Sequence, residues 1–481
     1  MTKPLPYAHN DPLKIVVEQL IKWQQDKQAE ELIDTFTLAA GDHLELNNLC
    51  ASLYHDVRAF DKCEKQTLKV LDMCKDPQSK YSVRANLAKM YNAFNEPKKA
   101  LFYSKQNLAV NPDSPETQLE MVFSYFLNGQ KEEAKSLLNK MKEEEYIYPE
   151  HTRDIINFNR GTYLMEEGKF LEGLGGFLLN VKKLDLWFNN KDIPLPYWDG
   201  TYDLKDNPLI LYMSGGGYGD AFIAITYMKK LEARGIKPIF VSPNYPEIIK
   251  MFNRHGYESY DTWQDAVKVY PNAHWCFAFE TVLYAKMQPE EMKTENFLWA
   301  SDEARAKWAW MKDRKKLKVG VRFIGNKRNN QLLYRHIELD KMMDFLHETF
   351  KGVDVEYYSL QKGDGEEEAA SCPELINVAD QIESFDDTAA LLENLDIVIS
   401  TCTSVVHLSA AVGTKTVVFV PIAAYFTYLM PQREDRPPHT SLWYGDNFRY
   451  FRQVKPKDWT DPMKEAKEFI QNEYLHNNIN N

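Results

Sequence analysis

The sequence predicts an α+α/β protein, in which a helical-repeat array is followed by an α/β domain with two parallel-sheet halves. In the first part of the chain, a pattern of apolar and small residues recurs after 34 positions. In the second part, seven short apolar runs alternate with helix-like stretches. With 481 residues, the chain is long enough for about three compact units.

The repeat rests on two neighbouring segments. Four positions agree between them, in the pairs Leu87 and Met121, Ala88 and Val122, Tyr91 and Tyr125, and Ala100 and Ala134. This spacing is typical of tetratricopeptide-like helix pairs, in which small residues let two helices approach closely. We expect the array to span residues 1–190, and a plain helical bundle is the alternative. The array could bind a protein partner or substrate, or could be only a scaffold for the next domain.

The α/β part follows a linker rich in turn-forming residues, at 189–207. Buried strands that alternate with helices predict parallel sheets covered on both faces. A charged stretch at 302–318 divides the runs, so we expect two Rossmann-like halves at 191–310 and 311–481, the second ending in a helix. The seven predicted strands are 209–213, 238–242, 275–279, 318–323, 355–360, 395–400 and 416–421. Ligands of such sheets lie beyond the carboxyl ends of the strands.

Composition excludes several classes of protein. No run reaches the ~20 apolar residues of a membrane-spanning helix, and the first residues lack the apolar core of a signal peptide, so we expect a cytoplasmic protein. The six cysteines form no CxxC pair, and no metal-binding motif is present, so we expect reduced thiols and no metal. A net charge of −12 argues against a large footprint on duplex DNA, although a local basic face remains possible.

The first candidate site is the glycine-rich loop that follows the first predicted strand. Its glycines, Gly217 and Gly219 among them, allow a ligand to approach the backbone before a helix begins. Asp220 stands at the start of that helix. It could cap the helix, or it could serve as a general base that points into a cleft.

The second candidate is the start of a helix of small residues after the strand at 395–400. Thr403 and Ser404, together with the free N–H groups of the helix start, suit a pyrophosphate. His407 lies on the same helix face as Ser404, because the two are three positions apart. A packed core histidine is the alternative for His407.

A third group follows the strand at 318–323. Asn326, Lys327 and Arg335 are near the strand end, where basic residues could neutralise phosphates or could belong to a solvated loop. Near the C-terminus, Trp443 and Tyr444 could stack on a base or sugar, or could pack against the sheet.

Seven motifs, in their order and spacing, carry a resemblance to a known family. They are PYWDG, GGGYGDAF, VGVRFIGNKRNN, SLQKGDGEEE, FDDTAALLENLDIVIS, STCTSVVHLSAAVG and LWYGDNFRYFRQ. The chain resembles bacterial and phage tetratricopeptide-repeat proteins whose C-terminal half is similar to heptosyltransferases, glycosyltransferase family 9. These have the GT-B fold, and O-GlcNAc transferase is a more distant analogue in architecture.

The resemblance implies an inverting, metal-independent glycosyl transfer from a nucleotide-diphosphate sugar, with no cofactor. The acceptor would be a hydroxyl of a glycan, a protein or a modified DNA base. Asp220 matches the family's base, and Arg335 matches a residue that meets the donor phosphates. The other donor-binding positions would be Gly217, Gly219, Asn326, Lys327, Cys402, Thr403, Ser404 and His407.

One departure from the family leaves the donor sugar open. Cys402 replaces an acidic residue that is close to the donor sugar in relatives. A repeat scaffold with a decayed nucleotide-sugar-binding domain is therefore the main alternative, and a sugar-nucleotide epimerase is a weaker one.

Overall fold

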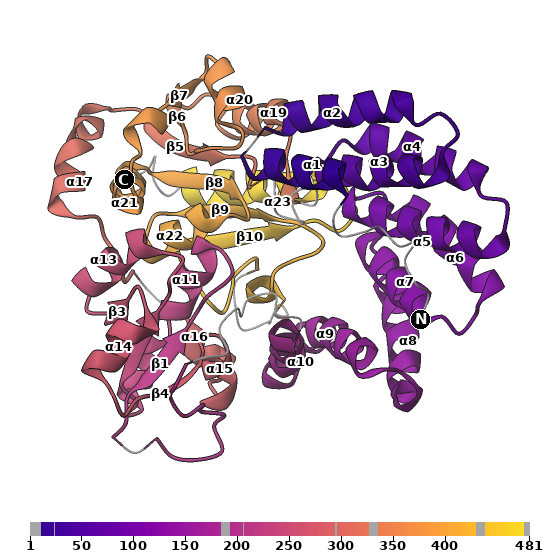
Figure 1. Ribbon diagram of the computed structural model, residues 1–481. Coiled ribbons are helices and arrows are strands. Elements are labelled where there is room, and N and C mark those ends of the chain that lie inside the picture. The colour runs from indigo at the N-terminus through magenta and orange to yellow at the C-terminus, as the bar shows by residue number, and fades with distance from the viewer. Residues whose placement is uncertain are drawn as a thin grey trace. The chain divides into compact units, whose positions relative to one another are not determined.

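The computed structural model describes residues 11–23, 25–183, 193–204, 206–293, 296–326, 335–429 and 438–475. The chain divides into two compact units, residues 1–148 and 149–481 (Figure 1). Among the described residues, no helix has the length and apolar character needed to cross a membrane. The predicted domain boundaries at residues 190 and 310 stay predictions.

The first unit is a row of helices. Those described are α1 (Pro12–Lys22), α2 (Asp26–Ala39), α3 (Leu44–Asp56), α4 (Phe60–Met73), α5 (Pro77–Ala93), α6 (Pro97–Val110), α7 (Pro115–Leu127) and α8 (Lys131–Glu143), followed by the short η1 (Glu145–Ile147). Asp11, Asp76 and Ser114 cap α1, α5 and α7, each before a proline in the first turn.

Helices that follow one another in the chain pack as neighbours in this unit, including α3 with α4, α5 with α6 and α7 with α8. Seven of the eight positions matched in the repeat are buried, and Tyr125 is half-buried. The predicted helical array is confirmed, because the repeated apolar and small residues form the contacts between its helices.

The second unit begins with two helices, α9 (Glu150–Glu166) and α10 (Phe170–Lys183). Glycines let them approach closely, since a Cβ on Gly173 would lie 2.6 Å from the Gly161 carbonyl oxygen. Phe170, Leu174 and Phe177 of α10 belong to the same buried apolar cluster as the strands that follow. This helix pair is therefore part of the core of the α/β unit.

The first half of the α/β region is a parallel sheet in the order β3-β2-β1-β4. Its strands are β1 (Leu209–Tyr212), β2 (Pro238–Val241), β3 (Ser259–Tyr260) and β4 (His274–Phe277). Its helices are α11 (Tyr218–Ile225), α12 (Met228–Ala233), α13 (Pro246–Arg254), α14 (Trp263–Val269), α15 (Glu280–Tyr284) and α16 (Pro289–Met292).

The second half is a parallel sheet in the order β10-β9-β8-β5-β6-β7. Its strands are β5 (Leu317–Arg322), β6 (Val355–Ser359), β7 (Leu375–Asn377), β8 (Ile397–Thr401), β9 (Thr416–Val420) and β10 (Phe448–Arg452). Its helices are α17 (Asp302–Lys307), α19 (Leu339–Thr349), α20 (Glu366–Ser371), α21 (Phe385–Asn394), α22 (Ser404–Val412) and α23 (Thr460–Phe469), and its short turns are η2 (Ala309–Asp313), η3 (Ala379–Gln381), η4 (Phe426–Tyr428) and η5 (Ile470–Leu475).

Each of the seven apolar runs predicted as a strand overlaps one of the observed strands. Strand order reverses between β1 and β4 in the first sheet and between β5 and β8 in the second, and such points are where open α/β sheets bind ligands. The helices that follow β1 and β8, α11 and α22, pack on each other (Figure 1). Two Rossmann-like halves joined in this way confirm the predicted fold class, a helical array followed by a GT-B arrangement.

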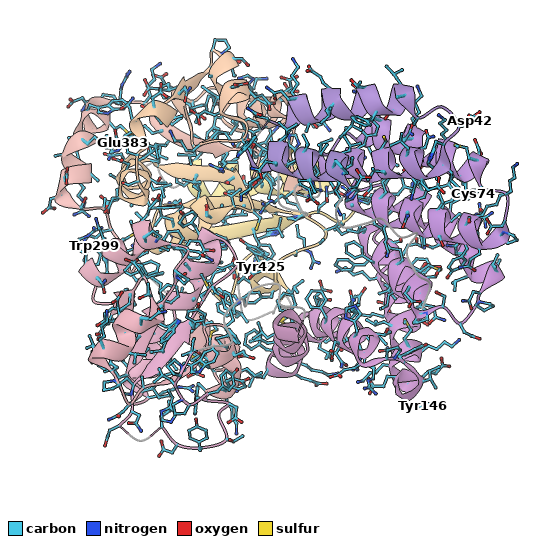
Figure 2. All side chains as sticks on the ribbon, viewed as in Figure 1. Asp42, Cys74, Tyr146, Trp299, Glu383 and Tyr425 are labelled. Atoms are coloured by element: carbon cyan, nitrogen blue, oxygen red, sulfur yellow. The ribbon has the colours of Figure 1, made fainter. Side chains whose placement is uncertain are left out.

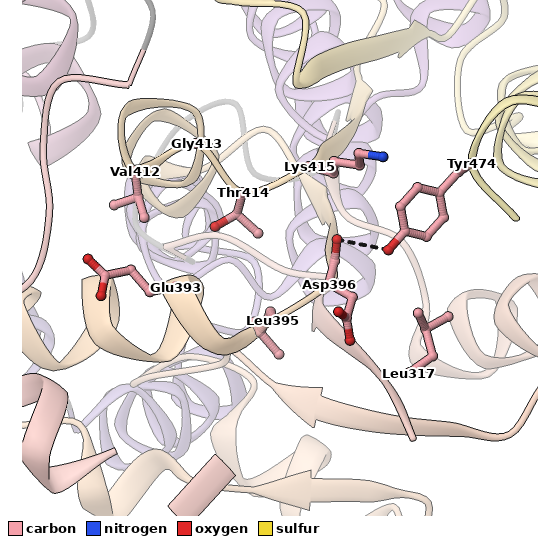
Figure 3. Close-up of a pocket in the computed structure, with 9 residues that line it drawn as sticks. All are labelled: Leu317, Glu393, Leu395, Asp396, Val412, Gly413, Thr414, Lys415 and Tyr474. Carbon is pink, nitrogen blue, oxygen red and sulfur yellow. Dashed lines mark hydrogen bonds between the residues drawn. The ribbon is translucent and has the colours of Figure 1, made fainter. Parts of the chain in front are cut away.

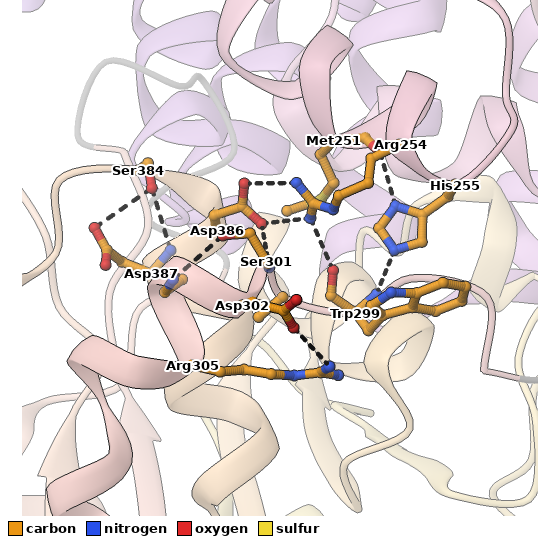
Figure 4. Close-up of polar contacts among 12 residues, drawn as sticks. Met251, Arg254, His255, Trp299, Ser301, Asp302, Arg305, Ser384, Asp386 and Asp387 are labelled. Carbon is orange, nitrogen blue, oxygen red and sulfur yellow. Dashed lines mark hydrogen bonds and ion pairs between the residues drawn. The ribbon is translucent and has the colours of Figure 1, made fainter.

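Polar contacts also join the two halves on one side of this junction (Figure 4). Arg254 at the end of α13 donates to both carboxylate oxygens of Asp386 on α21, at 3.0 and 2.5 Å. It also donates to the carbonyl oxygen of Trp299, in the segment that connects the halves. Asp386 Oδ1 also accepts a hydrogen bond from the Ser301 N–H, at 3.1 Å. This network fixes α13, the connection and α21 together.

Candidate active site at the junction of the two sheets

The Asp220 carboxylate forms hydrogen bonds with both halves of the α/β unit, one through each oxygen. Oδ2 accepts the Gly217 N–H at 2.5 Å and so caps the start of α11. Oδ1 accepts the hydroxyl of Tyr425, a residue of the second half, also at 2.5 Å. The two roles weighed for Asp220 are therefore compatible, since capping occupies one oxygen and leaves the other directed at the second half.

Glycines shape the loop around this carboxylate. Gly216 has a φ of +91°, which favours glycine, and a Cβ there would lie 2.8 Å from Asp220 Oδ2. The hydroxyl of Tyr245, the N-cap residue of α13, donates to the Gly216 carbonyl oxygen at 2.6 Å and supports the loop. Burial raises the pKa of Asp220 above its ordinary value, and the bonds from Tyr425 and Gly217 and the charge of Arg335 oppose that rise.

The start of α22 meets α11 directly. Gly219 has no side chain at the point where one would collide, because a Cβ there would lie 2.7 Å from His407 Cδ2. Thr403 is the N-cap residue of α22, yet its side chain makes no capping bond. The Oγ1 atoms of Thr401 and Thr403 are buried and have no hydrogen-bond partner among the described residues. With Ser404, they provide free hydroxyls beside the N–H groups of a helix start.

His407 lies inside the junction as a neutral ring. It is 6% exposed, and its Nδ1 forms a short hydrogen bond with the hydroxyl of Tyr444. Burial, aided by the charge of Arg335, lowers the pKa of His407 to about 3. This is the packed geometry that was the alternative for His407, and its predicted contact with the donor stays a prediction.

Two arginines meet beside the start of α22. Arg335 Nη1 donates to the carbonyl oxygen of Cys402 at 2.8 Å, and its guanidinium lies on the backbone of Gly325. Arg322, the last residue of β5, donates to the carbonyl oxygen of Leu360 at 2.5 Å. Burial and the neighbouring charge of Arg335 lower the pKa of Arg322 to about 10.

Neither guanidinium has a carboxylate within ion-pair distance in the part of the chain that the structure describes. The Nε atoms of both are buried and have no hydrogen-bond partner there. Two adjacent cations with unsatisfied donors disfavour each other, and an anion between them would remove both costs. Sequence reasoning missed Arg322, because an arginine that ends a strand has no local signal that separates it from a solvated one.

Cys402 gives this site a neutral, buried thiol. Its thiol is buried and lies 3.7 Å from the hydroxyl of Tyr428. Burial raises the pKa of the thiol, so it carries no charge at neutral pH.

The remaining predicted site residues lie near the same edge or outside the described residues. Asn326 is exposed immediately after Gly325, and Lys327 lies outside the described residues. Trp443 is 1% exposed and packs edge-on against Phe426, so it is part of the core. No group of three His, Cys, Asp or Glu side chains among the described residues could hold a metal ion.

A surface pocket of about 600 Å³ lies at the opposite edge of the second sheet (Figure 3). Leu317, Asp396 and Lys415 line it where β5, β8 and β9 begin. It is therefore separate from the residues described above, which gather where β1, β5 and β8 end.

No protein-family model and no curated protein matches the chain. Among solved structures, it is similar to a glycosyl transferase family 9 protein from Veillonella parvula (8% identity, TM-score 0.36, 57% of this chain and 93% of that one). It is similar to ADP-heptose LPS heptosyltransferase II of E. coli (10% identity, TM-score 0.32, 44% of this chain and 84% of that one). It is also similar to a Thermobaculum terrenum O-GlcNAc transferase (10% identity, TM-score 0.37, 97% of this chain and 91% of that one).

Proposed function

We propose that this protein is a glycosyltransferase that moves a sugar from a nucleotide-diphosphate sugar to an acceptor hydroxyl, with inversion and without a metal ion. The observation that carries the proposal is that groups suited to bind an anion and a carboxylate suited to act as a base lie at the same junction. Arg322, Arg335 and the start of α22 offer unsatisfied donors to an anion. Asp220 offers a carboxylate from the other half.

The donor diphosphate would lie against the second half. As the bond from the anomeric carbon to the diphosphate oxygen breaks, negative charge grows on the leaving group. The N–H groups of α22, the free hydroxyls of Thr403 and Ser404 and the two guanidiniums would stabilise that charge. These groups would supply the stabilisation that a divalent cation gives in other transferases.

The acceptor would lie against the first half. Asp220 would take the proton of the acceptor hydroxyl while its oxygen forms the new bond to the anomeric carbon, on the face opposite the departing diphosphate. A single displacement of this kind inverts the anomeric centre. Cys402 and Tyr428 would present neutral groups to the donor sugar, so we propose no acidic contact there and leave the sugar open.

The place of the reaction and its acceptor are also part of the proposal. We place the reaction in the cytoplasm, with a glycan, a protein or a modified DNA base as acceptor. The helical array would bind the acceptor or a protein partner. The decayed scaffold remains the second candidate because Cys402 has replaced an acid, and the experiment below separates the two.

The first test is nucleotide binding, followed by thermal unfolding. A ligand at 100 times its dissociation constant adds about 2.7 kcal/mol to stability. We expect one nucleoside diphosphate, or its sugar, to stabilise the protein, and we expect Arg335→Ala and Arg322→Ala each to weaken that effect. Arg314→Ala is the matched control, because Arg314 pairs with Glu356 through a salt bridge at 3.1 Å that is not part of this site.

The outcomes separate enzyme from scaffold. Stabilisation by one nucleotide, lost in the two site variants and kept in Arg314→Ala, supports the donor site, and acceptors can then be screened with Asp220→Asn as the inactive control. Turnover should continue in excess EDTA. If no nucleotide stabilises the protein, the transferase proposal fails and the scaffold becomes the better description.

A further inference from the structure

Tyr425, labelled in Figure 2, belongs to the second half, and its hydroxyl donates a hydrogen bond to Asp220 Oδ1. We infer that Tyr425 is a positioning residue for Asp220, and that it holds the carboxylate ready for proton transfer only while the two halves are in contact. The catalytic part of this inference rests on the proposed function, whereas the contact itself can be tested without it.

The geometry holds the carboxylate at both ends. Gly217 donates to Oδ2 and Tyr425 donates to Oδ1, so rotation about the last side-chain bond would break one bond or both. Tyr425 is itself fixed by its ring, which packs at 4.5 Å from the ring of Phe426. The tyrosine follows β9 and the aspartate follows β1, and the two are 205 positions apart in the chain. Separation of the halves would therefore remove this donor from the base.

The Tyr425 bond also leaves one lone pair of Oδ1 for a substrate. A carboxylate oxygen has two lone pairs, and the Tyr425 hydroxyl uses one of those on Oδ1. The acceptor hydroxyl would donate to the other. Tyr425 would then remain in place during the reaction and would orient Asp220 without exchanging a proton.

The charge around Asp220 makes this donor important. Burial disfavours the carboxylate, and the Tyr425 hydroxyl is the strongest of the groups that favour it. Among the described residues, the ionisable groups that interact with Asp220 are Tyr245, Arg335, Cys402, Tyr425 and Tyr444, and His407 stands beside the same helix. Of these, Arg335 carries a charge at neutral pH, since burial keeps the tyrosines, the thiol and the imidazole neutral.

The first experiment needs no enzyme activity. It compares the melting temperature from pH 4 to pH 8 for wild type, Tyr425→Phe, Asp220→Asn and the double variant. Asp220 has a folded-state pKa above its ordinary value of 3.8, so its ionisation costs stability as pH rises through that range. Loss of the hydroxyl raises that pKa further. The melting-temperature deficit of Tyr425→Phe should therefore grow with pH, and should be constant with pH when Asp220 is asparagine.

The matched control is Tyr227→Phe. The Tyr227 hydroxyl is also buried, but it donates to the carbonyl oxygen of Ala278, a neutral acceptor, at 2.5 Å. Its loss should give a deficit that does not change with pH. A Tyr425→Phe deficit that is equally constant, or that persists unchanged with Asp220→Asn, would overturn the inference.

The second experiment measures catalysis once a donor is known. We expect Tyr425→Phe to lower kcat by about 10- to 100-fold, the scale of a lost hydrogen bond to a charged group, and to move the acid limb of the kcat profile to higher pH. Nucleotide affinity should stay within about twofold, because the hydroxyl does not belong to the phosphate site. An unmoved acid limb would refute the positioning role. Absence of nucleotide binding in wild type would instead refute the proposed function and leave the stability result standing.

Discussion

Gly325→Ala should weaken nucleotide binding while leaving the fold intact. A Cβ at this position would lie 2.8 Å from Nη2 of Arg335 and 2.9 Å from its Cζ and Nε. Non-bonded heavy atoms are ordinarily about 3.5–4.0 Å apart, so the guanidinium would have to move by roughly 0.6–1.2 Å. The guanidinium is the end of a flexible side chain, so the side chain can move while the backbone of Gly325 stays in place.

The magnitudes for binding and folding differ. A hydrogen bond between an arginine and a phosphate contributes about 1.5–3 kcal/mol, so loss of half of it weakens binding by roughly fourfold to tenfold. The interaction that folding would lose is the hydrogen bond from Arg335 to the Cys402 carbonyl oxygen, 2.8 Å long in the wild type. Its loss would lower the free energy of unfolding by about 0.5–1.5 kcal/mol. The less flexible unfolded chain of the alanine variant would raise that free energy by about 0.4–1 kcal/mol, so the two effects largely cancel.

The assay is isothermal titration with the nucleoside diphosphate that stabilises the wild type, together with urea unfolding. Gly175→Ala is the matched control, because a Cβ there would make ordinary contacts with Leu283 at 3.6 and 3.7 Å. In an Arg335→Ala background, Gly325→Ala should have no further effect on binding. Wild-type affinity in Gly325→Ala, or an equal loss in the absence of Arg335, would refute this reasoning.

Three further predictions concern stability. Gly173→Ala should destabilise the protein by about 1–3 kcal/mol in urea, because its Cβ would lie 2.6 Å from the Gly161 carbonyl oxygen and 2.8 Å from the Met165 nitrogen, both backbone atoms; an unchanged midpoint would contradict this packing. The wild type should lose stability as pH falls from 6.5, the ordinary pKa of histidine, toward the folded-state pKa of His407, about 3. His407 should contribute up to ~1.4 kcal/mol of this loss per pH unit. Urea unfolding at pH 7, 6 and 5 should therefore show a smaller loss of stability for His407→Gln than for the wild type. A double-mutant cycle of Arg254→Ala and Asp386→Ala should give a coupling energy of about 1 kcal/mol that falls in high salt; a value of zero would mean that the bidentate pair of Figure 4 contributes nothing to the folded state.

Features with a local cause could be predicted from the sequence. The seven predicted strands could be recognised because each is a short, largely apolar run. Three other strands were missed: β3 and β7 are two and three residues long, and β10 combines two arginines with three aromatic residues. The helix array was predictable because its repeated residues serve the same contact in each unit.

The residues of the candidate site likewise fall into those that a local sequence signal identifies and those that it does not. Asp220 and Thr403 stand at helix starts, so a turn motif and a capping position were enough to select them. Arg322 and Tyr425 acquire their importance from residues far away in the chain. Nothing local distinguishes Arg322 from a strand-end arginine in water, and the partner of Tyr425 is 205 positions distant. The roles of all these residues stay predictions until the tests above are made.

A buried apolar cluster that spans both halves of the α/β unit has a consequence for how the molecule melts. It is continuous across both sheets: Leu211 and Phe222 of the first half and Val398 and Val406 of the second belong to one cluster, together with Phe170 of α10. Two halves that share a core cannot unfold independently, because unfolding of one half would expose apolar surface of the other half to water. Calorimetry should therefore give a single peak for residues 149–481, in which the calorimetric and van't Hoff enthalpies agree. Any opening needed to admit a substrate would be a small shear along α11 and α22, since wide separation of the halves would carry much of the cost of unfolding.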